Sequence, residues 1–274
     1  MQLYKIGLNP NDTSSLLNNS ALYEYNRLKT ILDPIDCDDF ICILNGISKE
    51  PSTFPANKKK IFIATDGFCF DKNKDIIDEC DYVLHQSERR LEFIHKPQGY
   101  NYVPFLFTNN EPKSIIQDSK VIFGGANRGR DDKINKYILN GSTINPDVVA
   151  FLKMYDNEGN VIFDNRVEYS AFIRIMRSYK YTICFSRKEY DEMQWTTARF
   201  FEAVSNYTLP LVDSTYCVHS LFSGMVNVVT SYYQMCNVID KMSEEERLNN
   251  INLLNDIIIA YQDAFKDTIL SIIG

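Results

Sequence analysis

The sequence is poor in histidine and has no long apolar run, and each shortage excludes a class of function. Its 274 residues include three histidines, at positions 85, 95 and 219, whose spacing fits neither a metal-ligand pair nor a helical HExxH motif. A catalytic zinc ion is therefore not expected. No run approaches the ~20 apolar residues that span a bilayer, and the start, Met1 to Ile6, is too soon interrupted for a signal peptide. We expect a cytoplasmic protein that does not enter a membrane.

Basic residues are also fewer than acidic residues. Lys and Arg number 29 against 36 Asp and Glu, which gives a formal net charge of −7. Binding nucleic acid through a field over the whole surface would need the opposite balance, because phosphate neutralisation requires clustered cations. A local basic groove is still compatible with this composition. The seven cysteines include no CxxC pair and lie mostly in apolar runs, which is typical of reduced core thiols in a cytosolic protein.

Short apolar runs alternate with longer stretches of helical periodicity, and this alternation predicts parallel sheets flanked by helices. Two such sets occur, separated by a polar segment at residues 107–113 that contains a proline. We therefore predict two α/β domains, 1–110 and 111–274. A capping box from Ser243 to Glu246 marks the start of the closing helices. Such a domain pair would form a cleft at the carboxyl ends of both sheets, where ligands of these folds usually bind.

The apolar runs and the helical periodicities also predict individual elements. Buried strands are expected at residues 3–8, 40–44, 60–65, 82–85, 120–123, 148–154, 181–185 and 209–212. Helices are expected at residues 20–32, 131–139, 168–179, 196–205 and 232–242, with one or two more at 243–273.

A glycine-rich turn follows a predicted strand in the second half. It reads Gly-Gly-Ala-Asn-Arg-Gly-Arg from Gly124 to Arg130, and a predicted helix begins at Asp131. Gly125 lets the backbone approach an anion closely, the helix start supplies unpaired amides, and Arg128 and Arg130 offer planar forks that match phosphate oxygens. The turn therefore predicts a pyrophosphate cradle. The alternative is a solvated turn whose arginines offset nearby acids; a Walker A loop is excluded because the GK[ST] ending is missing.

Arg199 and Glu202 lie three positions apart in a predicted helix and so share one helix face. A guanidinium near the start of a helix can hold a diphosphate, and a carboxylate one turn later can accept two hydrogen bonds from ribose hydroxyls. The pair therefore suits a nucleotide. The alternative, which the pair taken alone favours, is an intrahelical ion pair on the surface, which contributes only about a few tenths of a kcal/mol.

Asp66 follows the predicted strand 60–65 and precedes Gly67. A carboxylate at the carboxyl end of a buried strand points into the expected cleft, where partial desolvation would raise its basicity. It could then remove a proton from an acceptor hydroxyl. The alternative is that Thr65-Asp66-Gly67 is an ordinary turn, which is the more frequent meaning of this tripeptide.

Taken in order, these motifs resemble those of the T-even bacteriophage DNA β-glucosyltransferase family, which transfers glucose from UDP-glucose to 5-hydroxymethylcytosine in duplex DNA. The resemblance is loose over the first hundred residues and closer from about residue 120 onward. It rests on four segments, which are Lys60 to Asp66, Val121 to Arg128, Thr197 to Glu202 and Asp263 to Lys266.

The resemblance implies a GT-B glycosyltransferase with two Rossmann-like domains that inverts configuration at the sugar. It also implies a role for each candidate residue. Asp66 corresponds to the general base and Glu202 to the ribose anchor. The diphosphate clamp corresponds to Arg128, Arg130 and Arg199, with Gly125.

Two departures from the family pattern limit what can be carried over. Ala126 stands where the family has a serine, and the arginine loop is about one residue shorter, so Arg130 is the less certain of its two arginines. The donor is expected to be UDP-glucose or a UDP-pentose such as a UDP-arabinose, with no required cofactor and an optional Mg or Mn ion. A monomer is expected.

Three alternatives for the function remain open, two of which differ in the acceptor. Duplex DNA requires a positive rim, which this composition supplies only if the basic residues of the first half gather on one side, namely Lys58 to Lys60, Arg89, Arg90 and Lys96. The second is a glycosyltransferase acting on a glycan, a lipid or a small molecule. The third is a non-catalytic nucleotide-sugar-binding protein.

Overall fold

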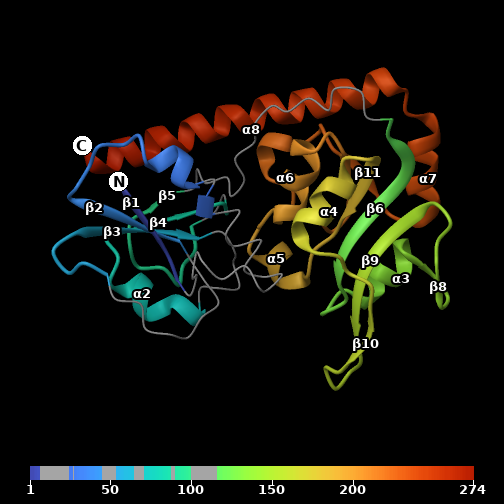
Figure 1. Ribbon diagram of the computed structural model, residues 1–274, viewed down its shortest axis with the longest axis horizontal. Helices are drawn as coiled ribbons and strands as arrows, with labels where there is room; N and C mark the ends of the chain where they lie inside the picture. Colours follow the sequence, from blue (N-terminus) through green and yellow to red (C-terminus); the bar gives the residue numbers. More distant parts are fainter. Residues whose placement is uncertain (7–24, 27, 45–53, 65–70, 88–89, 100–115) are drawn as a thin grey trace. The chain divides into compact units, whose positions relative to one another are not determined.

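The computed structural model describes residues 1–6, 25–26, 28–44, 54–64, 71–87, 90–99 and 116–274, and every structural statement below concerns these residues (Figure 1). The chain divides into two compact units. The first comprises Met1–Phe107 with Ile258–Gly274, and the second comprises Thr108–Ile257.

The first unit is built on a five-stranded sheet whose strands follow one another in sequence order. Each strand pairs in parallel with the next. All five residues of the strand at 40–44 are apolar and buried, as expected for a parallel strand that is covered on both faces. The strands are β1 (Gln2–Lys5), β2 (Phe40–Leu44), β3 (Lys59–Ala64), β4 (Tyr82–His85) and β5 (Gln98–Gly99).

The second unit contains a six-stranded sheet in the order β10-β9-β6-β11-β12-β13. All its pairs are parallel except that between β10 and β9. A separate antiparallel pair joins β7 (Leu139–Asn140) to β8 (Thr143–Ile144). The strands of the large sheet are β6 (Asp118–Ala126), β9 (Val148–Tyr155), β10 (Val161–Asp164), β11 (Tyr179–Cys184), β12 (Leu209–Asp213) and β13 (Asn227–Val229).

Helices connect most of these strands, as expected for an α/β fold. Residues 25–26 and 28–32 are also helical. The first unit has η2 (Asp71–Asn73) and α2 (Lys74–Asp78). The second unit has α3 (Asp131–Tyr137), α4 (Tyr169–Met176), α5 (Lys188–Glu192), α6 (Ala198–Ser205), η3 (Ser220–Phe222) and α7 (Tyr232–Lys241).

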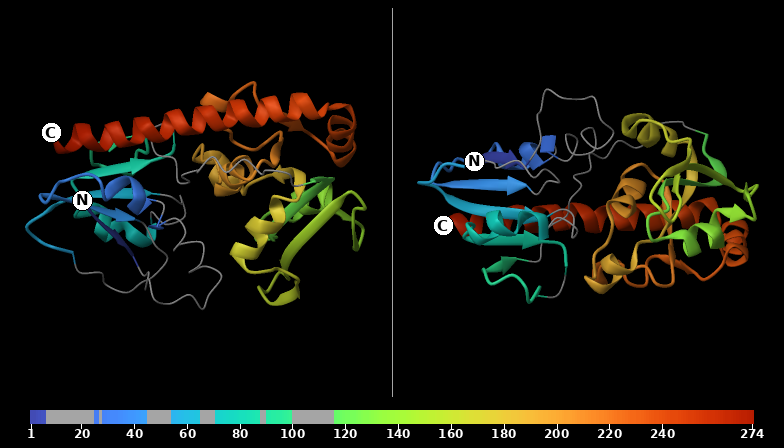
Figure 2. Two further views of the ribbon diagram at one scale, coloured as in Figure 1. Left: turned by 45° about the horizontal axis from the view of Figure 1, so that its top comes forward. Right: turned by 90° about the horizontal axis from the view of Figure 1, so that it is seen from below.

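The last helix, α8 (Glu244–Ile273), contributes to both units and is the long red helix in all three ribbon views (Figure 2). Its start is capped by Ser243, whose Oγ accepts a hydrogen bond from the amide of Glu246 at 3.1 Å. Near this end Arg247 is buried and donates to the carbonyl of Tyr207 at 3.0 Å in the second unit. Toward the other end, Phe265 packs in the core of the first unit.

The mixed α/β architecture with parallel sheets and a closing helix matches the sequence-based prediction. Two details differ. The last part of α8, residues 258–274, belongs to the first unit, whereas the sequence-based boundary placed the whole closing segment in the second. Strand β10 was not predicted, because its apolar run, residues 161–163, is only three residues long; all four residues of the strand are exposed.

Candidate active site

The strand order of the six-stranded sheet contains a switch point. From β6 the chain continues to β9 on one side of the sheet and later returns to β11 on the other, so the order reverses between β6 and β11. In open α/β sheets, ligands bind at the carboxyl ends of the strands at such a switch point. The glycine-rich turn starts in the last three residues of β6, and residues 185–187 follow β11, so both segments lie at this point.

The two positions at the end of β6 require glycine for different physical reasons. A Cβ added at Gly124 would lie 2.4 Å from the ring of Phe172, so this glycine lets α4 pack directly on the strand. A Cβ added at Gly125 would lie 3.0 Å from Nη2 of Arg130. Gly125 therefore lets the guanidinium of Arg130 fold back over the strand end.

Arg130 is held at the switch point by backbone oxygen and an aromatic ring. Its Nε and Nη2 both donate to the carbonyl of Ala126, with Nε at 3.1 Å. Its guanidinium lies 5.7 Å from the ring centre of Phe185, the first residue after β11. Burial, together with the nearby charges of Arg187 and Arg199, lowers the pKa of Arg130 to about 10. Arg130 thus lies among cations.

Arg199 reaches the same strand end from α6. Its Nη2 donates to the carbonyl of Gly124 at 3.3 Å, and its guanidinium lies 4.3 Å from the ring centre of Phe172. Its Nη1 lies 2.7 Å from Oε2 of Glu202. Glu202 is only 5% exposed, and its Oε1 accepts a hydrogen bond from the hydroxyl of Tyr169 at 2.7 Å. The intrahelical ion pair of the alternative interpretation is therefore present, but its carboxylate is buried rather than on the surface.

Arg128 lies on the other side of the turn. Its Nη2 donates to the hydroxyl of Tyr155 at 2.9 Å, and its guanidinium stacks over that ring at 4.7 Å. Asn127 holds the turn there by donating to Asp131 at 2.7 Å and to the carbonyl of Tyr155 at 2.8 Å. Gly129 completes the turn with φ +72°, in the left-handed region that glycine adopts without strain. The structure therefore brings Arg130 and Arg199 together and places Arg128 toward β9.

Arg187 is a residue that sequence reasoning missed. It is the third residue after β11, the strand that lies next to β6 in the sheet, and its charge acts on Arg130. The available signal was a basic residue just after a buried apolar strand. That signal acquires meaning only when β11 is known to lie beside the glycine-rich turn.

Asp66, the predicted general base, lies outside the described residues, as does Arg89 of the predicted basic rim. The strand before Asp66, β3, ends at Ala64 and is buried over its last four residues. Lys60, another residue of that rim, pairs with Glu79 at 3.1 Å.

The described cluster suits an anion better than a resident metal ion. Within the described ranges, no group of three or more His, Cys, Asp or Glu side chains could hold a metal. The carboxylate at the switch point, Glu202, is already paired with Arg199. Divalent ions such as Mg²⁺ prefer several oxygen ligands, whereas guanidinium groups prefer phosphate or carboxylate.

Comparison with known proteins identifies the fold. No protein-family model matches the chain, and no curated protein matches its sequence. Among solved structures, T4 phage BGT in complex with UDP and Mn²⁺ matches with a TM-score of 0.61 and 12% identity, covering 97% of this chain and 98% of that one.

Two further structures match over most of the chain. The DNA-modifying enzyme β-glucosyltransferase, studied with and without uridine diphosphoglucose, gives a TM-score of 0.56 at 11% identity, covering 97% of this chain and 98% of that one. The apo structure of OtsA gives a TM-score of 0.50 at 9% identity, covering 94% of this chain and 77% of that one. The chain therefore has the GT-B fold of the phage DNA β-glucosyltransferases, as its ordered motifs predicted.

Proposed function

We propose that the protein is a UDP-sugar-dependent glycosyltransferase that inverts configuration at the transferred sugar. The observation that carries the proposal is the meeting of Arg130 and Arg199 at the switch point beside β6, with the buried carboxylate of Glu202 next to them. A diphosphate supplies the negative charge that this cluster lacks, and ribose hydroxyls can donate to Glu202. The match in fold to UDP-sugar enzymes supports the same conclusion.

The proposed reaction is a single displacement. An acceptor hydroxyl oxygen attacks the anomeric carbon from the face opposite UDP, the bond from that carbon to the diphosphate oxygen breaks, and Asp66 takes the hydroxyl proton. Arg130 and Arg199 stabilise the charge that develops on the departing UDP. Arg128 and the backbone at Gly125 complete the clamp at the outer side of the turn.

No step of this reaction is assigned to a metal. A divalent ion such as Mg²⁺ or Mn²⁺ could bind together with the UDP-sugar, through the oxygens of its diphosphate. The cations already present neutralise the leaving group, so transfer does not depend on that ion in this proposal.

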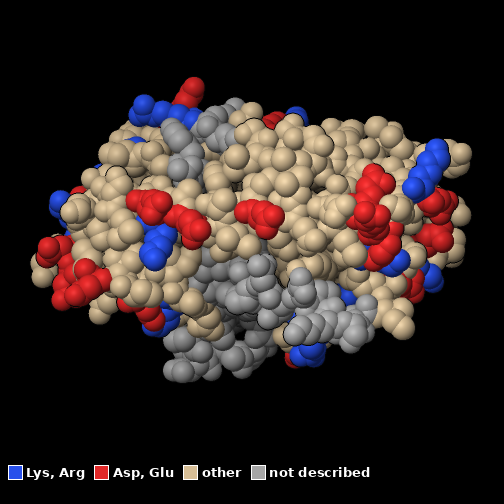
Figure 3. All heavy atoms as spheres, turned by 90° about the horizontal axis from the view of Figure 1, so that it is seen from above, with Lys and Arg blue, Asp and Glu red and all other residues tan. Residues whose placement is uncertain are grey.

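For the acceptor we propose 5-hydroxymethylcytosine in phage DNA, with glucose or a pentose such as arabinose as the sugar. The support is the match to a DNA-modifying enzyme. Charge weighs against it. On the face in Figure 3, the coloured residues form several acidic patches with scattered basic ones, and the net charge is −7. These observations favour a second candidate, transfer to a glycan, lipid or small molecule.

The proposal extends to the cell and the assembly. We propose a monomer that acts in the cytoplasm, which is the host cytoplasm for a phage protein. Along the described ranges, no helix has the length and apolar character needed to cross a bilayer.

A transfer assay separates these candidates. The purified protein is incubated with a panel of UDP-sugars and with hydroxymethylated or plain DNA, and nucleosides are then analysed by mass. A gain of one hexose or one pentose on hydroxymethylcytosine supports the DNA acceptor. UDP-sugar consumption without labelled DNA supports the second candidate, and UDP binding with neither outcome supports a non-catalytic sensor.

Asp66→Ala tests the proposed base. We expect this variant to lose transfer while its UDP affinity stays within about two-fold of wild type, because the acceptor side does not hold the leaving group. Calorimetry with UDP and the mass assay measure the two properties separately. Loss of both together would show that Asp66 is structural.

A further inference from the structure

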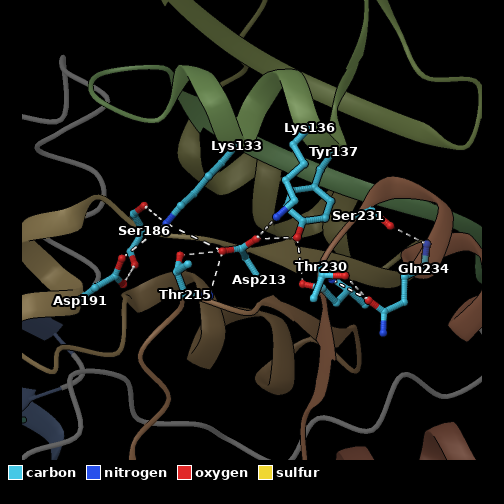
Figure 4. A network of polar contacts seen from close by, with 11 residues as sticks. Lys133, Lys136, Tyr137, Ser186, Asp191, Asp213, Thr215, Thr230, Ser231 and Gln234 are labelled. Atoms are coloured by element: carbon cyan, nitrogen blue, oxygen red, sulfur yellow. Dashed lines mark hydrogen bonds and ion pairs between the residues drawn. The ribbon is translucent and has the colours of Figure 1, made fainter.

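A second polar cluster lies beside the arginines, at the carboxyl ends of β11 and β12 (Figure 4). At its centre is Asp213, the last residue of β12, which is 1% exposed. Its carboxylate accepts hydrogen bonds from Lys136 at 2.9 Å, Tyr137 at 2.5 Å and Thr215 Oγ1 at 2.6 Å. Asp213 is thus well satisfied by these three side chains.

Lys133 lies in the same cluster but makes different contacts. Its side chain is 12% exposed, and its Nζ lies 4.0 Å from Asp213, beyond hydrogen-bond distance. The shorter contacts of Nζ are to the carbonyl of Ser186 at 3.0 Å and to Asp191 Oδ2 at 3.4 Å. Ser186 Oγ in turn donates to Asp191. The main partners of Lys133 therefore lie around the loop that follows β11.

This ammonium joins the two segments that meet at the switch point. Lys133 is the third residue of α3, the helix that begins directly after Arg130. Ser186, whose carbonyl it holds, is followed directly by Arg187. A charge-assisted hydrogen bond, here partly buried, is stronger than a neutral one. Lys133 therefore sets the spacing between the loops that carry Arg130 and Arg187.

We propose that Lys133 is a positioning residue for the diphosphate site, acting through the Ser186-Arg187 loop rather than by touching the ligand. This inference rests on the proposed function, because it takes UDP as the ligand. Lys136 provides a matched control. It is one turn further along α3 and carries the same charge, yet its acidic contact is with Asp213 and not with the loop.

The test compares Lys133→Met with Lys136→Met. UDP affinity is measured by calorimetry and fold stability by urea unfolding. We expect Lys133→Met to weaken UDP binding on the order of ten-fold, the size of one lost charge-assisted hydrogen bond, and to raise the KM for the donor more than it lowers kcat. Lys136→Met should destabilise the fold at least as much and change UDP affinity by less than about three-fold. Lys133→Arg, which keeps a charged donor, should recover part of the affinity.

A double-mutant cycle with Arg187→Met tests the route of the effect. If Lys133 acts through Arg187, the double variant should bind UDP about as weakly as Arg187→Met alone. If Lys133→Met does not fold, Asp191→Asn provides the second variant, since it weakens the same contact and should give a smaller loss.

Two outcomes would overturn the inference alone. One is equal UDP affinity for the Lys133 and Lys136 variants while wild type binds UDP, and the other is full additivity in the cycle. Absence of UDP binding by wild type would instead refute the proposed function, and with it the ligand on which the inference rests.

Discussion

Two charged clusters share the carboxyl edge of the six-stranded sheet and differ in how their charges balance. At the switch point, Arg199 pairs with the buried carboxylate of Glu202, and the charges of Arg187 and Arg199 both act on Arg130. Arg130 donates a hydrogen bond to a backbone carbonyl, and its pKa is lowered by burial and by the charges of its neighbours. Adding an anion to such a cluster would offset the repulsion among its cations.

At the ends of β11 and β12 the charges are matched. Lys133 and Lys136 face Asp191 and Asp213 at distances of 2.9 to 4.0 Å. Burial alone would raise the pKa of Asp213, but hydrogen bonds from Thr215, Tyr137 and Lys136 lower it to about 2. From this comparison we expect the cluster of neighbouring cations to be the proposed binding site, and the balanced, mutually bonded charges to anchor the fold.

The first prediction removes charge from the unbalanced cluster. Arg130→Met should weaken UDP binding on the order of 100-fold, because a charge-assisted contact in a buried site is lost. Urea unfolding should show unchanged or slightly higher stability, since a buried cation among other cations is costly. Arg128→Met is the matched control and should lose less affinity, because Arg128 stacks on Tyr155. Equal losses for both variants would remove the distinction between the two arginines.

The second prediction removes charge from the balanced cluster. Asp213→Asn should lower the free energy of unfolding by about 2 to 4 kcal/mol at pH 7, because a neutral amide would replace the buried carboxylate that accepts from Lys136, Tyr137 and Thr215. UDP affinity of the folded variant should change little. Urea unfolding and calorimetry measure the two effects. A variant that kept full stability while losing UDP binding would contradict the anchoring role.

The same carboxylate makes stability depend on pH. The pKa of Asp213 falls from an ordinary 3.8 to about 2 on folding, so the ionised form favours the folded state. Its contribution is complete above about pH 4 and is lost as the pH falls toward 2. The stability difference between wild type and Asp213→Asn should therefore shrink from pH 5 to pH 3.

The third prediction separates fold from site within two adjacent residues. Gly124→Ala places a methyl group 2.4 Å from Phe172 and should cost about 1 to 3 kcal/mol of stability. Gly125→Ala meets the flexible end of Arg130 at 3.0 Å and the ring of Phe123 at 3.3 Å, both less close than the contact at Gly124. It should leave stability nearly unchanged and weaken UDP binding by a few-fold. Reversed effects would show that the roles of the two glycines are exchanged.

Local pattern predicted much of the fold, because buried parallel strands are continuous apolar runs. Strand β2 was expected at its observed bounds, 40–44, for this reason. Short edge strands have only short apolar runs, of two or three residues, and β13 (Asn227–Val229), with one buried residue, was missed together with β10. Periodicity reports what an element buries, so it cannot find elements that bury little.

Of the residues that lie at the switch point, only those that are neighbours in sequence could be singled out beforehand. The glycine-rich turn and the Arg199 to Glu202 spacing are local patterns, and both lie at the switch point. Arg187 and the Asp213 cluster were not found, because their partners come from distant segments. Tyr137, which donates to Asp213, lies 76 residues before it. Only the strand order brings these groups together.

The central claim is that the arginines at the switch point hold the diphosphate of the donor. Calorimetry that compares UDP with uridine tests it most directly, because the two ligands differ only in the diphosphate. We predict that UDP binds at least about 100-fold more tightly than uridine and that Arg130→Met removes most of this preference. Equal affinity for the two ligands, or a preference that survives the loss of Arg130, would contradict the account.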